Sequence, residues 1–173
     1  MNKQDIKDIF DYNYWANYHL LTFAEKLTPE QFVAPSTHSF SSIQGTLIHT
    51  LDMEWHWRVL LQGNGWMEEA LNAGDFPTVA ALRTRWQQDE AEMWDYLNGL
   101  SDDDLVGKIR YPGDPGMMRV RTVWHCLYHL VNHGMQHRSE VAHLLTGYDQ
   151  SPGQLDFTIF LNEHRPPQAE PIE

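Results

Sequence analysis

Apolar residues recur every three to four positions along most of the chain, which is the spacing of one face of an α-helix. The first such segment spans residues 3–26. Its repeating apolar positions are Ile6, Phe10, Tyr14, Leu21 and Ala24. A short helical turn follows at Thr28-Pro-Glu-Gln31, which combines a capping box with proline at the first helical position. The chain therefore begins with an amphipathic helix and a capped turn.

Three more long segments repeat this spacing, and each begins at a residue type that caps helices. Ser41-Ser-Ile-Gln44 has the form of a capping box and opens a helix to about residue 61, closed by Gly63. The core stripe of this helix is predicted to be Ile48, Leu51, Trp55 and Val59. Thr78 opens a helix that stops at Gly99, and Thr122 opens one that ends at Gly147.

The remaining segments are short. Residues 108–121 surround the turn sequence Pro112-Gly-Asp-Pro-Gly116 and predict a small hairpin or two extended arms. Residues 155–162 predict a short last helix, and the proline-rich residues 165–173 predict a frayed tail. Four long helices with one crossover segment amount to an all-α four-helix bundle, in a single domain of residues 1–164.

Charge and composition narrow the choice of partners. The chain has 173 residues, with 12 Lys and Arg against 24 Asp and Glu, for a net charge of −12. This charge repels nucleic acids and anionic lipid surfaces, so neither is expected as a partner. The single cysteine, Cys126, permits no disulfide within the chain, and no segment resembles a signal peptide or a membrane span. We therefore expect a soluble, cytoplasmic protein.

The most informative feature is a histidine at every fourth position of the last long helix. These residues are His125, His129, His133 and His137. Neighbours four apart on a helix lie about 5–6 Å apart at Cβ, so two imidazoles can bind one metal ion. At about 100° per residue, His137 and His133 lie about 55° and 95° from the centre of the apolar stripe, whereas His129 and His125 lie near 135° and 175°. The predicted metal pair is therefore His133 with His137, and His125 is expected to face solvent.

A third ligand must come from another helix, because a stable site needs at least three protein groups. The second long helix offers His49, next to its core stripe. Glu140 follows His137 by three residues, so it is a candidate fourth ligand or an acceptor that orients an imidazole. The other candidates for residues around the metal are His129, Asp52 and His56.

Other polar residues have simpler interpretations. The remaining histidines are predicted to be surface or hydrogen-bonded residues, namely His19, His38, His125, His143 and His164. Cys126 is expected to be an inert buried thiol. Arg138 falls inside the apolar stripe, where a charge must be paired, and we expect its guanidinium to meet a carboxylate or helix-end carbonyls.

The His-rich helix also carries a family resemblance. Asn132-His-Gly-Met-Gln-His-Arg138 resembles the signature helix of the DinB-like (DinB/YfiT) superfamily, whose pattern is N-H-x-x-x-H-R-G-Q. Other segments resemble further parts of that family: Asn13–Asn17, Leu27–Gln31, Ile43–His49, and Asp156 with Phe160-Leu161. One departure is Ser139-Glu140, where Gly-Gln is common. The resemblance implies an up-down-down-up bundle, often dimeric, in which His49, His133 and His137 bind nickel or zinc.

Two classes of function follow. Three neutral imidazoles leave a divalent ion its charge and an open position, which suits an enzyme that activates a water or thiol nucleophile toward a small molecule. The resemblance favours an enzyme, because the DinB-like superfamily includes metal-dependent thiol S-transferases and a thiol-dependent isomerase. A thiol nucleophile would give a thiol S-transferase-like activity with a low-molecular-weight thiol as one substrate, and a water nucleophile a hydrolase-like activity. The alternative is a non-catalytic metal-binding or stress-response protein, whose metal is structural or sensed. DNA binding is suggested only by the family's name, and the charge counts against it.

Overall fold

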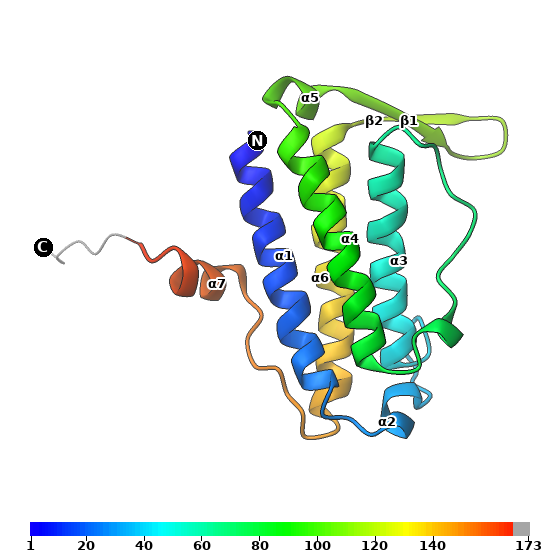
Figure 1. Cartoon of the computed structure of the whole chain (residues 1–173), viewed down its shortest axis with the longest axis vertical. Helices are drawn as coiled ribbons and strands as arrows, with labels where there is room; N and C mark the ends of the chain where they lie inside the picture. Colours follow the sequence, from blue (N-terminus) through cyan, green and yellow to red (C-terminus); the bar gives the residue numbers. More distant parts are fainter. Residues whose placement is uncertain (168–173) are drawn as a thin grey trace, which may run out of the picture.

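The protein is described from a computed structural model, which defines residues 1–167. Its body is a bundle of four long helices: α1 (Lys3–Ala24), α3 (Ile43–Leu61), α4 (Val79–Gly99) and α6 (Val123–Thr146). Helix α6 packs against both α1 and α3, and α4 packs against the same two helices. In Figure 1, α1 and α6 run downward whereas α3 and α4 run upward, which is the predicted up-down-down-up arrangement.

Short elements lie at the two ends of the bundle and, in the case of α7, beside α1 (Figure 1). They are α2 (Pro29–Val33), η1 (Ala73–Asp75), α5 (Asp102–Val106), β1 (Lys108–Pro112), β2 (Met118–Thr122) and α7 (Phe157–His164). The predicted hairpin is confirmed: β1 and β2 pair antiparallel across the end where α4 finishes and α6 begins (Figure 1). Because α3 and α4 are parallel, residues 62–78 run the length of the bundle to connect them. Helix α5 has no counterpart in the sequence-based prediction.

Some of the predicted helix caps are confirmed by the structure, and others are wrong. The Thr28 capping box and the Thr78 cap are confirmed. The predicted box at Ser41 is wrong: Ser42 is the capping residue, whose hydroxyl accepts from Gly45 N, while Ser41 has φ 64° in a left-handed turn. Thr122 precedes α6 as predicted, but its hydroxyl accepts from Lys108 Nζ at 2.6 Å and does not cap the helix.

The hydrophobic core follows the predicted stripe in α1 and departs from it in α3. All five predicted positions of α1 are buried. In α3, Ile48 and Leu51 are buried, but Trp55 and Val59 are only half-buried. The charged residues Glu54 and Arg58 occupy buried positions of that helix, at 5% and 2% exposure. The α3 stripe prediction is therefore wrong at its second half, because the buried face carries charges there.

The C-terminal segment lies against the bundle as far as it is described. Helix α7 confirms the predicted last helix, and its Phe160 packs on Trp15 with ring centroids 5.7 Å apart. Within the predicted tail, Arg165 donates to Asp11 at 2.8 Å and pairs with Asp8. The rest of that tail, residues 168–173, lies outside the described residues. Among residues 1–167, no helix is both long and apolar enough to cross a membrane.

Candidate metal centre

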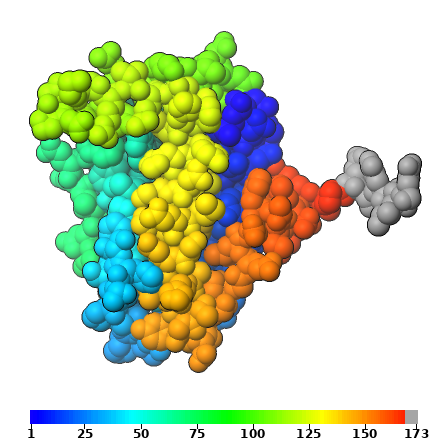
Figure 2. Space-filling model, turned by 180° about the vertical axis from the view of Figure 1, so that it is seen from behind, coloured from blue at the N-terminus to red at the C-terminus, as the bar shows by residue number. Residues whose placement is uncertain are grey.

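Three histidines converge between α3 and α6, two helices that lie side by side on the back of the molecule (Figure 2). His49 projects from α3, and His133 and His137 project from consecutive turns of α6. The Nε2 atom of His133 lies 3.2 Å from Nε2 of His49 and 3.2 Å from Nε2 of His137. One donor nitrogen from each ring falls within 4.8 Å of the other two. The three rings therefore aim their nitrogens at one point.

This spacing fits a metal ion. A tetrahedral ion with Zn–N bonds of about 2.0–2.1 Å holds its ligand nitrogens about 3.3–3.4 Å apart. The two observed Nε2–Nε2 distances of 3.2 Å are close to that value. Two histidines one turn apart on α6 and a third from the neighbouring helix could thus bind one divalent ion without a change in backbone.

Burial keeps two of these rings neutral. The pKa of His49 is lowered to about 4, first by burial and then by the neighbouring His137. The pKa of His133 is also lowered to about 4 by burial, with the nearby imidazoles adding to the effect. A neutral imidazole offers a lone pair, whereas a protonated one does not, so these rings are available as ligands at neutral pH.

Glu140 lies where it can orient one of the three rings. Its Oε2 accepts a hydrogen bond from Nδ1 of His137 at 2.9 Å, one turn along the same helix. This bond fixes the proton on Nδ1 and leaves the lone pair of Nε2 directed at the cluster. The carboxylate therefore contacts the far side of His137 and does not point at the space between the three Nε2 atoms.

Phe40 covers one side of the cluster, a contact that the sequence analysis missed. Its ring stacks on His49, with centroids 3.6 Å apart and planes inclined by 14°, and meets the edge of His137 at 5.3 Å. Gly45 permits this approach, because a Cβ there would lie 2.2 Å from the carbonyl oxygen of Phe40. The signal was present in the sequence as a glycine in the first turn of a helix, where it weakens the helix unless close packing requires it.

The other candidate residues lie outside the cluster. Asp52 Oδ1 accepts from Leu71 N at 2.8 Å and so anchors the crossover segment. His56 Nδ1 lies 2.6 Å from the backbone oxygen of Asp52 and 3.5 Å from its carboxylate. His129 is exposed, with its ring centroid 5.8 Å from that of His133. The structure thus brings Glu140 to the metal cluster, whereas Asp52 and His56 contact each other further along α3 and Asp52 also contacts the crossover segment.

Arg138 has different partners from those expected. Its Nη1 donates to Asn13 Oδ1 at 2.6 Å and to Asn17 Oδ1 at 2.9 Å, both from α1. The predicted carboxylate partner is therefore wrong, and only a weak 3.5 Å contact reaches a carbonyl, that of Val131. Gly134 makes room, because a Cβ there would lie 2.7 Å from Nη1. This arrangement joins α6 to α1 behind the histidine pair.

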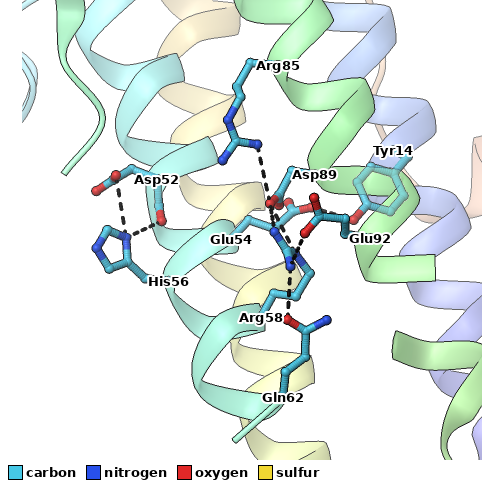
Figure 3. A network of polar contacts seen from close by, with 9 residues as sticks. All are labelled: Tyr14, Asp52, Glu54, His56, Arg58, Gln62, Arg85, Asp89 and Glu92. Carbon is cyan, nitrogen blue, oxygen red and sulfur yellow. Dashed lines mark hydrogen bonds and ion pairs between the residues drawn. The ribbon is translucent and has the colours of Figure 1, made fainter. Parts of the chain in front are cut away.

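A second polar cluster connects α3 to α4 and α1 (Figure 3). Arg58 donates to the fully buried Asp89 through Nε at 3.1 Å and Nη2 at 2.5 Å, and pairs with Glu92 at 2.7 Å. Glu54 accepts from Tyr14 Oη at 2.5 Å and from Asn13 at 3.2 Å. Burial raises the pKa of Glu54. We call this set of residues the buried charge network.

The remaining histidines and the cysteine lie as predicted. His19 Nε2 contacts the carbonyl of Pro152 at 2.8 Å, and His164 Nδ1 contacts that of Phe160 at 3.0 Å. His125 is exposed, which confirms the predicted orientation of α6. Cys126 is buried, and burial raises the pKa of its thiol to about 11, so the thiol is protonated at neutral pH.

Comparison with known proteins agrees with this architecture. The sequence profile described as the DinB family matches residues 1–169. The chain belongs to the DinB family. Protein DinB of Bacillus subtilis (strain 168) is 27% identical over 172 aligned residues, which cover 90% of this chain and 94% of that protein. A relative from the same organism, named "Uncharacterized protein YizA", is 23% identical over 133 residues, with coverage of 77% and 81%. The DinB-family resemblance found in the sequence is thus confirmed along the whole bundle.

Proposed function

We propose that this DinB-family protein binds one divalent metal ion, nickel or zinc, through His49, His133 and His137. The observation that supports this most strongly is the convergence of three Nε2 atoms from two helices, with 3.2 Å between neighbours. Packing alone does not require such convergence, since an imidazole gains more by bonding to a carbonyl or to water.

We further propose that the bound ion serves a metal-dependent enzyme, of the thiol S-transferase or hydrolase type, that acts on a small molecule. A divalent ion on three neutral imidazoles keeps an open position, in which it lowers the pKa of a water or a thiol. The chain's own residues support this role. Glu140 holds the proton on Nδ1 of His137, and Phe40 shields one side of His49 from water.

The alternative is a structural or sensing metal without catalysis. Such a site is usually closed by a fourth protein ligand. Glu140 is the carboxylate that contacts the cluster, and its Oε2 accepts from the Nδ1 of His137, on the side of that ring away from the converging Nε2 atoms. This geometry favours the open, catalytic arrangement.

Elemental analysis of the purified protein tests the site. We expect about one equivalent of nickel or zinc in the parent protein, and less than a tenth of that in His49→Ala and in His133→Ala. His125→Ala is the matched control, since it removes an imidazole of the same helix that is exposed; it should keep the full metal content. Circular dichroism should show unchanged helicity in all three variants. Stoichiometric metal in His133→Ala would refute the assignment.

Activity is tested separately. Metal-loaded protein should accelerate the reaction of a small thiol with an aromatic chloride such as 1-chloro-2,4-dinitrobenzene, or the hydrolysis of an activated amide, and His133→Ala should not. Full metal occupancy without either activity would favour the structural or sensing role.

A further inference from the structure

A cavity of about 380 Å³ lies beside the metal centre, between the hairpin and the neighbouring ends of α3 and α6. The hairpin covers the upper end of α3 in Figure 2. Trp57 of α3, Trp66 of the crossover segment and Tyr111 of β1 form its aromatic wall. Arg119 and Arg121 of β2 line the same cavity. Two regions of the chain, residues 57–66 and residues 111–129, thus contribute to it.

The charge of this cavity is opposite to that of the whole protein. The chain carries 24 acidic residues against 12 basic ones, yet the cavity is lined by two arginines and by no aspartate or glutamate. Arg121 donates to the hydroxyl of Tyr111 at 2.5 Å and has no ion pair with a carboxylate in residues 1–167. Arg119 has only a loose 3.4 Å pair with the exposed Asp114. Both guanidiniums are therefore available to an anion.

The strand register explains why both arginines face the cavity. Arg119 is paired with Tyr111 and Arg121 with Ile109 across the hairpin, so these four side chains share one face. Tyr111 is buried against the bundle, which identifies that face as the inner one. Arg110 pairs with Val120 and projects from the opposite, outer face. The sequence therefore supplies a matched arginine outside the cavity.

The aromatic residues form a continuous surface on which a flat group can lie. Trp57 meets Tyr111 at 5.2 Å and Trp66 at 5.8 Å between ring centroids, both edge to face. Trp66 and Tyr111 are nearly parallel, with an interplanar angle of 26° and centroids 6.4 Å apart. Trp66 is 40% exposed, so its ring can still be covered by a ligand.

One residue, His129, lines the cavity and also neighbours the metal centre. His129 lines the cavity, and its ring lies 5.6 Å from Trp57 and 5.8 Å from His133 between centroids. Because His129 precedes His133 by one helical turn, the edge of the cavity lies about 5.4 Å along the axis of α6 from the first metal-ligand candidate of that helix.

We propose that this cavity binds a small molecule that joins an anionic group, such as a carboxylate, to a flat aromatic or unsaturated body. The anionic group binds Arg119 and Arg121, the flat body packs on Trp66 and Tyr111, and the remaining end points past His129 to the metal centre. The inference that this ligand is the substrate rests on the proposed function. The inference that the cavity binds such a ligand does not depend on the proposed function.

A pair of probes tests the charge requirement. 2-Naphthoate and its neutral analogue 2-naphthamide have the same flat body and differ in the carboxylate. Titrated into the protein and followed by tryptophan fluorescence and calorimetry, the naphthoate should bind at least roughly tenfold more tightly than the amide, as expected for a charge-assisted hydrogen bond to arginine. Raising the salt concentration should weaken the binding of the naphthoate and leave the binding of the amide unchanged.

Variants locate the binding. Arg119→Gln and Arg121→Gln should each weaken the binding of naphthoate roughly tenfold and leave the binding of the amide unchanged. Arg110→Gln removes the same charge from the outer face of the same strands and should bind naphthoate like the parent. Equal binding of the two probes, no binding of naphthoate, or an equal loss in Arg110→Gln would overturn the proposal.

His49→Ala separates this proposal from the metal assignment. It should bind naphthoate with parental affinity, because His49 does not line the cavity. If the parent protein contains no metal but binds naphthoate with the predicted arginine dependence, the cavity is a binding site and the proposed metal function fails. If the metal is present but naphthoate does not bind, the present inference fails alone.

Discussion

Helix α3 contributes to two polar clusters that differ in how their groups are satisfied. At the metal centre, His49 meets two imidazoles of α6, and its Nε2 lies 3.2 Å from Nε2 of His133. In the buried charge network, Arg58 and Glu54 meet carboxylates, a phenol and an amide that complete most of their hydrogen bonds. Lone pairs converge on a common point in the first cluster, whereas donors face acceptors in the second.

The same physical cause has opposite consequences in these clusters. Burial disfavours the charged form of any group. It lowers the pKa of His49 and His133 and so leaves free lone pairs, but it raises the pKa of Glu54 and makes its carboxyl retain a proton. The partners of each group decide its role. Convergent lone pairs need a ligand, whereas a network whose donors already face acceptors stabilises the fold. The clusters should therefore differ in how much stability they contribute.

The largest effect is expected from Arg58→Ala. This change leaves the fully buried Asp89 without its principal partner, and the loss of one member of a buried ion pair costs about 3–5 kcal/mol. Urea unfolding measures the loss. Arg85→Ala is the matched control: Arg85 also approaches Asp89, at 3.6 Å, but its side chain is 22% exposed, and its loss should cost less than about 1 kcal/mol. Similar losses in both variants would contradict the assigned structural role.

The second prediction concerns pH. The pKa of Glu54 is raised by burial from 4.5 to about 8, so the native state binds this proton more tightly than the unfolded state. The corresponding stability is complete below pH 4.5 and is lost as the pH rises toward 8, by at most about 1.4 kcal/mol per pH unit. Glu54→Gln, measured by urea unfolding from pH 5 to 8, should lose this slope. The exposed Glu68→Gln should retain it.

The contrast between the clusters also explains what could be predicted from the sequence. The spacing of histidines four apart on a helix can be seen directly in the sequence. The apolar stripe of that helix then predicts which of them face the core. The exposure of His125 and the burial of His137 confirm that interpretation. The bundle, the hairpin and the last helix were predictable for the same reason, since each depends on local spacing and turn residues.

The buried charge network could not be predicted in this way. Periodicity treats charged residues as solvent-facing, so it assigned Trp55 and Val59 to the core of α3 in place of Glu54 and Arg58. Their burial depends on Asp89 and Tyr14, which lie in other helices and meet them only after packing. Arg138 was recognised as a buried charge, but its asparagine partners on α1 are equally remote in sequence.

The smallest effect is expected at Glu140, the one residue at the metal centre whose acceptor faces a donor, as in the buried charge network. Glu140→Gln keeps an acceptor for Nδ1 of His137 and removes the charge, so metal affinity should fall less than tenfold. Glu140→Ala removes the acceptor as well and should weaken binding roughly 10- to 100-fold. Competition with a chromogenic chelator measures both, with Gln136→Ala, an exposed neighbour on α6, as the control. If Gln and Ala weaken binding equally, the charge of Glu140 matters and the hydrogen bond does not. Orientation of His137 through its Nδ1 proton predicts the graded result.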